Sequence, residues 1–245
     1  MSTTIAVSGK GGSGKTTLTS MIIRHLMQRG GGILAVDADP NACLGLALGI
    51  CQQKTVADLR DETLSGKLPG ADADRERAFE YGLQQILAEA KGFDLLTMGQ
   101  PEGPKCYCAV NHLLRRYLDR ASSDYRWVVV DNEAGMEHLS RRTTNGVDLL
   151  LIVTEPTAVG VMTAQRILGL SERLPIAVKR RGVLWNKVAE GFLPAGADTL
   201  PTLGRVPLDP LVLEASMYGA TVFELDAGRP SFMAVGKMLE EQLKD

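Results

Sequence analysis

Short, almost continuously apolar segments alternate along the chain with longer segments that have a helical pattern. Strands buried on both faces are rich in Val, Ile and Leu throughout, so the short runs predict strands. The expected strands are Thr3–Ser8, Ile33–Asp37, Phe93–Met98, Trp127–Asp131, Asp148–Val153, Gly182–Asn186 and Thr202–Val206. The expected helices are Thr16–Gln28, Arg75–Lys91, Asn111–Ala121, Val161–Arg173, Leu208–Tyr218 and Ser231–Leu243. This alternation predicts an α/β fold, with a mostly parallel central sheet and helices on both faces.

The chain length fits one domain. It has 245 residues, and α/β folds commonly reach this length in one piece. The glycine triplet Gly30-Gly31-Gly32 is expected to end a helix rather than to form a linker. The stretch Ala189–Leu200 is rich in Gly, Ala and Pro and is expected to be a surface loop. We therefore expect a single P-loop domain over residues 1–245.

Charge and hydropathy argue against a nucleic-acid-binding, membrane-spanning or secreted protein. The formal net charge is -2, so no global basic field favours nucleic acid. No apolar run reaches the length of a membrane span, and the longest candidate, Val147–Val153, has the length of a strand. No basic start or cleavage site of a secretory signal precedes the first expected strand. We expect a cytoplasmic protein that binds neither nucleic acid nor a membrane.

A phosphate-binding pattern, G-x-x-x-x-G-K-[ST], lies between the first expected strand and the first expected helix. Glycines let successive backbone N–H groups face one anion, and the helix adds the positive end of its dipole. We expect Lys15 to reach the β- and γ-phosphates and the hydroxyl of Thr16 to hold Mg²⁺. The overlapping dinucleotide pattern G-x-G-x-x-G would leave both side chains without a role. The predicted nucleotide-binding residues of this loop are Gly9, Lys10, Gly11, Gly12, Ser13, Gly14, Lys15, Thr16 and Thr17.

Aspartates follow two of the expected strands. Asp37 and Asp39 come at the end of the second strand, and Asp131 ends the run Val128-Val129-Val130 in the Walker B form. The carboxyl ends of parallel strands are where such sheets bind ligands. Phosphoryl transfer depends mainly on positioning and charge neutralisation, so an oriented carboxylate suits the reaction. We expect Asp131 to bind Mg²⁺.

The early lysine of the loop, Lys10, carries a resemblance to a known family. The run Gly-Lys-Gly-Gly-x-Gly-Lys-Thr-Thr resembles the deviant Walker A loop of the P-loop ATPases that include MinD, ParA, the arsenite-pump ATPase and the nitrogenase iron protein. The resemblance implies that Lys10 reaches the nucleotide of the partner subunit in a homodimer. It also implies that Asp39 positions the attacking water and that Asp37 lies near the metal. Lys10, Lys15 and Asp39 are thus the expected catalytic residues.

The same resemblance extends to the γ-phosphate and the base. Asp131-Asn132-Glu133-Ala134-Gly135 fits the family's D-x-x-x-G segment, with the Gly135 amide available to a γ-phosphate. Asn186 resembles the strand-end asparagine that reads adenine, and Pro207 and Asp209 resemble the later loop on the adenine side. No guanine-reading N-K-x-D pattern follows Asn186. The resemblance therefore implies an ATPase that converts ATP and water to ADP and phosphate.

A second informative pattern is the C-x-C of Cys106 and Cys108. In extended backbone the two sulfur atoms lie on one side. Two thiolates are an incomplete set for tetrahedral Zn²⁺, and a two-fold dimer would supply four. Square-planar Ni²⁺ is the alternative for the same ligands. Two buried cysteines with no metal remain an equally open interpretation of the spacing, which is less specific than paired C-x-x-C motifs.

The segment Pro101–Thr144 narrows the resemblance to one branch, the CooC-type nickel-insertion accessory ATPase of carbon monoxide dehydrogenase. It implies that Cys106 and Cys108 bind Ni²⁺ or Zn²⁺ at the interface of a nucleotide- and metal-promoted homodimer. It also implies that apo carbon monoxide dehydrogenase is the client whose metal centre is matured.

Three alternatives remain open at this point. A reductase like the nitrogenase iron protein would draw its ligand cysteines from two well-separated segments, unlike this C-x-C. A positioning ATPase of the MinD/ParA type that binds a membrane would be expected to end in a basic amphipathic helix, whereas Met238–Asp245 leans acidic. A relative that matures acetyl-CoA synthase would carry much the same motifs.

Overall fold

The computed structural model describes residues 2–51, 54–65, 75–100, 116, 124–133, 146–189 and 193–244. Its strands are β1 Thr3–Gly9, β2 Ile33–Ala38, β3 Ala88–Ala90, β4 Phe93–Thr97, β5 Trp127–Asn132, β6 Gly146–Thr154, β7 Ala177–Val188 and β8 Thr202–Pro207. Its helices are α1 Lys15–Arg29, α2 Leu44–Ala47, α3 Val56–Leu64, α4 Arg75–Ile86, α7 Ala158–Ser171, α8 Pro210–Met217 and α9 Pro230–Gln242, with 3-10 turns η1 Ala197–Thr199 and η2 Val222–Glu224. The expected helix Asn111–Ala121 lies outside the described residues apart from Arg116.

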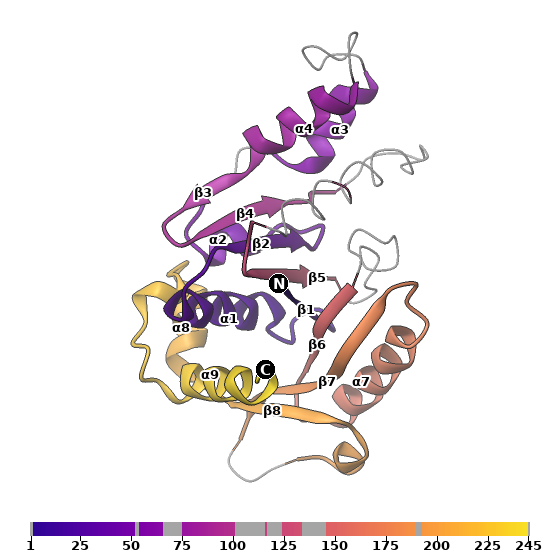
Figure 1. Ribbon diagram of the computed structural model, residues 1–245. Coiled ribbons are helices and arrows are strands. Elements are labelled where there is room, and N and C mark those ends of the chain that lie inside the picture. Colours follow the sequence, from indigo (N-terminus) through magenta and orange to yellow (C-terminus); the bar gives the residue numbers. More distant parts are fainter. Residues whose placement is uncertain are drawn as a thin grey trace.

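The strands form one eight-stranded sheet in the order β3-β4-β2-β5-β1-β6-β7-β8 (Figure 1). Every neighbouring pair is parallel except β3 with β4. Helices cover both faces, so the predicted α/β class with a mostly parallel sheet is confirmed. In the part of the chain that the structure describes, no helix is both long and apolar enough to cross a membrane.

One expected helix is too long at its C-terminal end. The segment predicted as a helix to Lys91 is helical only to Ile86, and β3 follows as an edge strand antiparallel to β4. The two strands are joined by a short turn in which Gly92 has φ 98°, a conformation that glycine adopts without the steric cost of a Cβ. Ala90 pairs with Phe93 across this turn. The hairpin forms because Phe93 and Leu95 are buried in the sheet beside it.

Two helices were not predicted. α2 is a single short turn after β2, and its only buried residues are Leu44 and Gly45. α3 begins at a capping box: the N–H of Asp58 donates to the Thr55 hydroxyl at 3.2 Å, and the N–H of Thr55 donates to the Asp58 carboxylate at 2.8 Å. The sequence signal T-x-x-D before an apolar run marks such a start, and it would have located α3.

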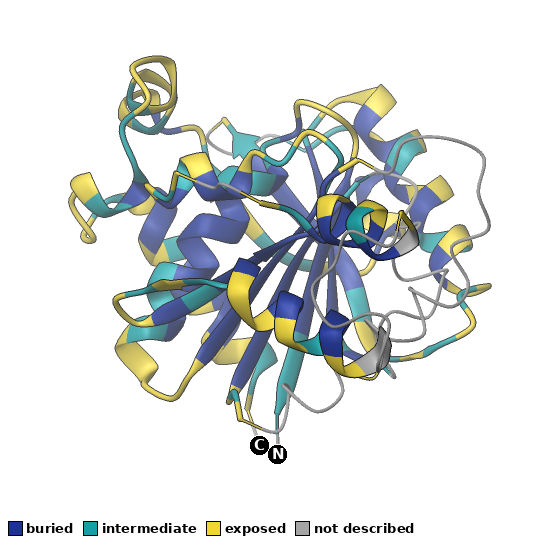
Figure 2. Cartoon of the chain, turned by 90° about the horizontal axis from the view of Figure 1, so that it is seen from above, coloured by how far each residue is buried: buried dark blue, intermediate teal, exposed yellow. Residues whose placement is uncertain are grey.

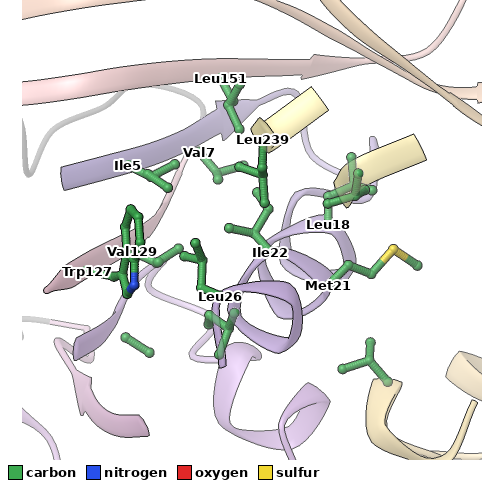
Figure 3. Close-up of a cluster of buried hydrophobic side chains, with 14 of the residues drawn as sticks. Ile5, Val7, Leu18, Met21, Ile22, Leu26, Trp127, Val129, Leu151 and Leu239 are labelled. Atoms are coloured by element: carbon green, nitrogen blue, oxygen red, sulfur yellow. The ribbon is translucent and has the colours of Figure 1, made fainter. Parts of the chain in front are cut away.

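Two layers of apolar side chains hold the helices to the sheet. α1, α2 and α9 pack on one face, whereas α3, α4 and α7 pack on the other. β1, β2, β4, β5 and β6 are buried along most of their length, and Figure 2 shows buried strands in the middle of the molecule. Figure 3 shows the first layer, in which side chains from α1 and α9 meet those of the strands; the labelled residues are Ile5, Val7, Leu18, Met21, Ile22, Leu26, Trp127, Val129, Leu151 and Leu239.

The stretch Ala189–Leu200 differs in part from the expected surface loop. Ala197 and Leu200, in and after the turn η1, are buried in the layer that also contains Val183 and Trp185. The segment therefore covers one end of the sheet with apolar contacts. Residues 190–192 lie outside the described part.

Candidate functional site

The phosphate loop joins the carboxyl end of β1 to the start of α1 in the middle of the sheet. The Ser13 hydroxyl and backbone N–H both donate to the carbonyl of Lys10, at 2.8 and 3.2 Å, which closes the loop on itself. A Cβ at Gly9 would lie 2.2 Å from the carbonyl oxygen of Val153, and a Cβ at Gly14 would lie 2.4 Å from Nδ2 of Asn186. Only glycine fits at these two positions, and the result is a backbone cradle at a helix N-terminus that suits an anion.

The end of β7 supports this loop. Nδ2 of Asn186 donates to the carbonyl of Ser13 at 2.8 Å, and its Oδ1 accepts from the N–H of Lys187 at 2.9 Å. In a trans peptide the C=O and N–H groups point in opposite directions, so the N–H of Gly14 points away from Asn186 and into the cradle. Asn186 keeps one further donor hydrogen and one acceptor lone pair for a base.

Two expected catalytic residues lie together at the loop. Lys15 is buried at the first position of α1, and its Nζ lies 3.9 Å from an Oδ2 of Asp39. Asp39 is held in place because its Oδ1 accepts from both the N–H and the Nδ2 of Asn41, at 3.0 and 2.8 Å. The third expected catalytic residue, Lys10, is exposed, which is the placement that action on a partner subunit requires.

Asp131, the penultimate residue of β5, is hydrogen-bonded to the first turns of α1. Its Oδ2 accepts from the hydroxyl of Thr16 at 2.7 Å, and its Oδ1 accepts from the hydroxyl of Thr19 at 3.3 Å. Burial raises the pKa of the Asp131 carboxyl to about 7 against the lowering effect of the Thr16 hydrogen bond. The nearby carboxylate of Asp37 contributes to this rise in the pKa.

Asp37 lies beside Asp131, because the two residues pair across the neighbouring strands β2 and β5. Its carboxylate accepts from the N–H of Leu44 at 2.8 Å and from the N–H of Asp39 at 3.3 Å. Burial raises its pKa to about 6, although these backbone hydrogen bonds lower it. Two adjacent buried carboxylates and the hydroxyl of Thr16 are the oxygen donors that Mg²⁺ prefers, and the cost of burying both negative charges is relieved by a divalent cation. The donor set thus fits Mg²⁺.

A cavity of about 290 Å³ opens beside the loop, between the ends of β7 and β8 and the helix α8. Its wall includes Gly14, Asn186, Pro207 and Leu208. Ligand pockets are typically apolar hollows of this order with a few oriented polar groups. The residues that were predicted to lie near adenine thus line a cavity next to the phosphate loop.

Asp209 is buried, and its carboxylate is hydrogen-bonded within the protein. Its carboxylate caps α8 by accepting from the N–H of Leu211 at 3.2 Å, and it also accepts from Nε of Arg229 and the hydroxyl of Ser231, each at 2.8 Å. A second hydrogen bond joins Nη2 of Arg229 to the other carboxylate oxygen. Asp209 also lies in the wall of the hollow beside the phosphate loop, on the predicted adenine side. Its carboxylate joins the start of α8 to the start of α9.

We expect Asp209→Asn to lower the free energy of unfolding at pH 7 by about 1–3 kcal/mol, because a buried charged hydrogen-bond network is broken. The Arg229 guanidinium holds the pKa of Asp209 below its usual range. The stabilisation is therefore complete above the unfolded pKa of about 3.9 and is lost as the pH falls through the lower folded value. Urea unfolding at pH 7 and pH 3 measures this, with exposed Glu214→Gln as the control on α8. A difference that grows on acidification would contradict the prediction.

Three predicted site residues lie outside the described residues: Gly135 and the cysteines Cys106 and Cys108. Among the residues that are described, no group of three or more His, Cys, Asp and Glu side chains could hold a metal ion. Cys43 and Cys51 are free and exposed. The described geometry thus bears on the nucleotide site, and the C-x-C site stays a prediction.

Comparisons with known proteins agree on one family. The family model of the CobQ/CobB/MinD/ParA nucleotide binding domain matches residues 4–222. The chain is 38% identical to an uncharacterized ATP-binding protein of Methanocaldococcus jannaschii over 250 aligned positions, which cover 97% of each chain. It is 33% identical to the carbon monoxide dehydrogenase accessory protein CooC of Rhodospirillum rubrum, over 90% of this chain and 89% of that protein.

Solved structures show the same fold. The MinD cell division protein of Aquifex aeolicus superposes with a TM-score of 0.71 at 22% identity, over 100% of this chain and 98% of that one. The septum site-determining protein MinD of Pyrococcus horikoshii, complexed with Mg-ADP, gives a TM-score of 0.70 at 21% identity, over 100% and 97%. At this level of identity the similarity concerns the fold alone.

Proposed function

The chain belongs to the CobQ/CobB/MinD/ParA family of nucleotide-binding P-loop ATPases, and from this premise we propose that it is an accessory ATPase for nickel insertion into carbon monoxide dehydrogenase. The observation that carries the proposal is the 33% identity to CooC over nine-tenths of both chains, together with the C-x-C of Cys106 and Cys108. In this proposal the protein works as a cytoplasmic homodimer, and apo carbon monoxide dehydrogenase is its client.

The nucleotide site supports the first half of this proposal. The triphosphate of ATP would lie in the cradle between Gly9 and Lys15, with the ammonium of Lys15 against its β- and γ-phosphates. Lys15 is buried and held at α1, so its charge is in place before the nucleotide arrives. Preorganised charge of this kind is the main contribution that a protein makes to phosphoryl transfer.

Magnesium has a matching set of ligands. Thr16 and Asp131 would hold the ion, with Asp37 beside them, because these oxygens already lie within hydrogen-bond distance of one another or in register across neighbouring strands. When bound, Mg²⁺ neutralises charge on the phosphate oxygens.

Asp39 is the residue that would orient the attacking water. Its carboxylate is partly exposed and held in place by Asn41. It can therefore accept a hydrogen bond from the attacking water without first changing its conformation. Gly135 would donate its N–H to the γ-phosphate. Lys10, which is exposed, would reach the nucleotide of the second subunit, and this requirement makes hydrolysis depend on the dimer.

The base would enter the hollow beside Asn186 and Pro207. The remaining hydrogen-bonding capacity of the Asn186 amide is sufficient to read one edge of adenine. Because its other contacts support the phosphate loop, recognition of the base and support of the loop depend on the same side chain.

The metal site would require both subunits. Each chain supplies the thiolates of Cys106 and Cys108, and two chains supply the four ligands that complete a tetrahedral Zn²⁺ or a square-planar Ni²⁺ site. A reducing cytoplasm keeps such thiols free for metal. In this proposal both ATP hydrolysis, through Lys10, and metal binding, through the cysteines, require the same homodimer.

The competing function in this family is that of a positioning ATPase. The MinD structures favour it only at the level of fold, at 21–22% identity, whereas the CooC relative is more similar in sequence. The distinguishing property is a metal ion that is held by the dimer.

The test is the stoichiometry of metal and chains with no nucleotide, with ADP and with ATP, by light scattering and elemental analysis after loading with NiCl₂ or ZnCl₂. We expect ATP to promote a dimer that retains about one metal ion per two chains. A dimer that forms with ATP and retains no metal would favour the positioning ATPase. Retained iron with a reversible redox signal would favour the electron-transfer reductase.

A further inference from the structure

Lys187, directly after Asn186, has an unusual backbone conformation. Its φ is 57°, in the left-handed region, and Ala42 is the other non-glycine residue with positive φ in the described part of the chain. This conformation costs free energy for a residue with a Cβ and persists where the surroundings enforce it. Here it turns the side chain of Lys187 toward the phosphate loop, where Nζ lies 3.3 Å from the carbonyl oxygen of Gly12.

Lys187 also binds the end of the neighbouring strand. Its Nζ lies 2.6 Å from Oε1 of Glu155, the residue that follows β6. β6 and β7 are parallel neighbours, and Thr154 pairs with Trp185. The backbone of Glu155 is itself fixed, because its carbonyl accepts from the N–H of Thr157 at 2.8 Å. The ammonium group therefore connects the loop to a rigid corner of the sheet.

We propose that Lys187 is a positioning residue for ATP binding, which together with Glu155 clamps the carbonyl of Gly12 and holds the phosphate loop in its binding shape before the nucleotide arrives. This inference rests on the nucleotide site proposed above.

Two physical arguments support the clamp. A glycine-rich loop has many accessible conformations, and ordering it on binding reduces affinity. A contact that orders the loop in the free protein removes that cost, which is the effect of preorganisation. Asn186 fixes the carbonyl of Ser13 and Lys187 fixes the carbonyl of Gly12. Two successive peptide groups of the loop are thus held from the same strand end, and the second hydrogen bond carries a charge, which strengthens it.

The first test is nucleotide affinity. We expect Lys187→Met to raise the Kd of ATP and of ADP by about tenfold, the effect of losing one charged hydrogen bond. The value of kcat should change by less than about threefold, because the phosphate loop binds the nucleotide equally in the ground state and in the transition state. Lys187→Arg should restore most of the affinity, since it keeps a donor of the same charge.

A matched control lies on the same strand. Lys179 on β7 forms an ion pair of equal length, 2.6 Å, with Asp148, but it lies far along the strand from the loop. Lys179→Met removes the same charge and should leave both affinities at the wild-type value. An equal loss of affinity in Lys179→Met would show a general charge effect and would overturn the clamp.

The second test does not need nucleotide. Hydrogen exchange of the free protein should become faster in residues 9–16 of Lys187→Met and of Glu155→Ala, and should stay unchanged elsewhere in the described strands. The double variant Glu155→Ala/Lys187→Met should behave like Lys187→Met alone, because both changes remove one connected unit.

Wild-type exchange in residues 9–16 of Lys187→Met would overturn the proposal, as would effects of Glu155→Ala and Lys187→Met that add in full. Faster exchange throughout β7 would show a purely structural role and would also overturn it. A wild-type protein that fails to bind ATP would instead refute the proposed nucleotide site, and the exchange measurement would still decide whether the clamp exists.

Discussion

Lys15→Ala is expected to lower the rate of ATP hydrolysis by about a hundredfold or more. Lys15 is the buried charge of the phosphate cradle, and its ammonium lies next to Asp39. Removal of one preorganised donor to developing charge typically costs a factor of about 100–1000 in rate. No neighbouring cation replaces it in the described geometry of the loop, since Lys187 is engaged with Glu155 and Lys10 is exposed. Steady-state phosphate release measures the loss.

Two companion variants make the Lys15 result specific. Asp39→Asn removes the carboxylate that orients water but leaves a side chain of the same shape, so it should also reduce turnover while ATP still binds. Lys179→Ala removes an exposed lysine that is paired with Asp148 and should leave turnover unchanged. Near-normal hydrolysis in both Lys15→Ala and Asp39→Asn would show that the catalytic assignment is wrong.

Metal binding should be lost completely in Cys106→Ser/Cys108→Ser. The double substitution removes every proposed thiolate ligand, and in a two-fold dimer it removes all four at once. ATP binding should remain, because the cradle and the base hollow are built from other segments. Equilibrium dialysis with NiCl₂ measures the metal, and Cys51→Ser is the matched control because it removes one exposed thiol elsewhere.

The pH dependence of metal affinity is an independent test of whether these cysteines coordinate the metal as thiolates. A thiol must lose its proton to bind metal, so metal affinity should weaken as the pH falls below the ordinary thiol range. Unchanged nickel stoichiometry in the double variant would exclude the C-x-C site. An affinity that stays constant from pH 8 to pH 6 would exclude thiolate coordination even if the variant binds less metal.

The positions of the strands could be predicted from sequence because burial on both faces leaves an uninterrupted apolar run. The edge strand β3 could not, because its three residues, two of them alanine, fit a helix equally well, and the deciding factor is the turn at Gly92. The phosphate loop could be located from its residue spacing, and Asp37 and Asp131 from their places at the ends of two expected strands. Their side-by-side pairing depends on β5 lying between β1 and β2, which no local pattern encodes.

The contacts of Lys187 and Arg229 could not be predicted from the sequence. Lys187 belongs to no motif in the sequence, because no guanine-reading N-K-x-D pattern follows Asn186. Its contacts with Gly12 and Glu155 depend on the register of two strands and on one backbone angle. Asp209 lines the predicted base hollow, but its hydrogen bonds with Arg229 and Ser231 at the start of α9 could not be predicted from the sequence. Such contacts between distant segments are a property of the packed fold.

The backbone of Asp37 has one further contact with a geometric consequence. Its carbonyl accepts from the N–H of Met98 at 2.8 Å, where the chain leaves β4. Cys106 follows Met98 by eight positions in the sequence, and an extended chain covers at most about 3.6 Å per residue. The first cysteine is therefore tethered within about 29 Å of the strand end that carries the acidic residues.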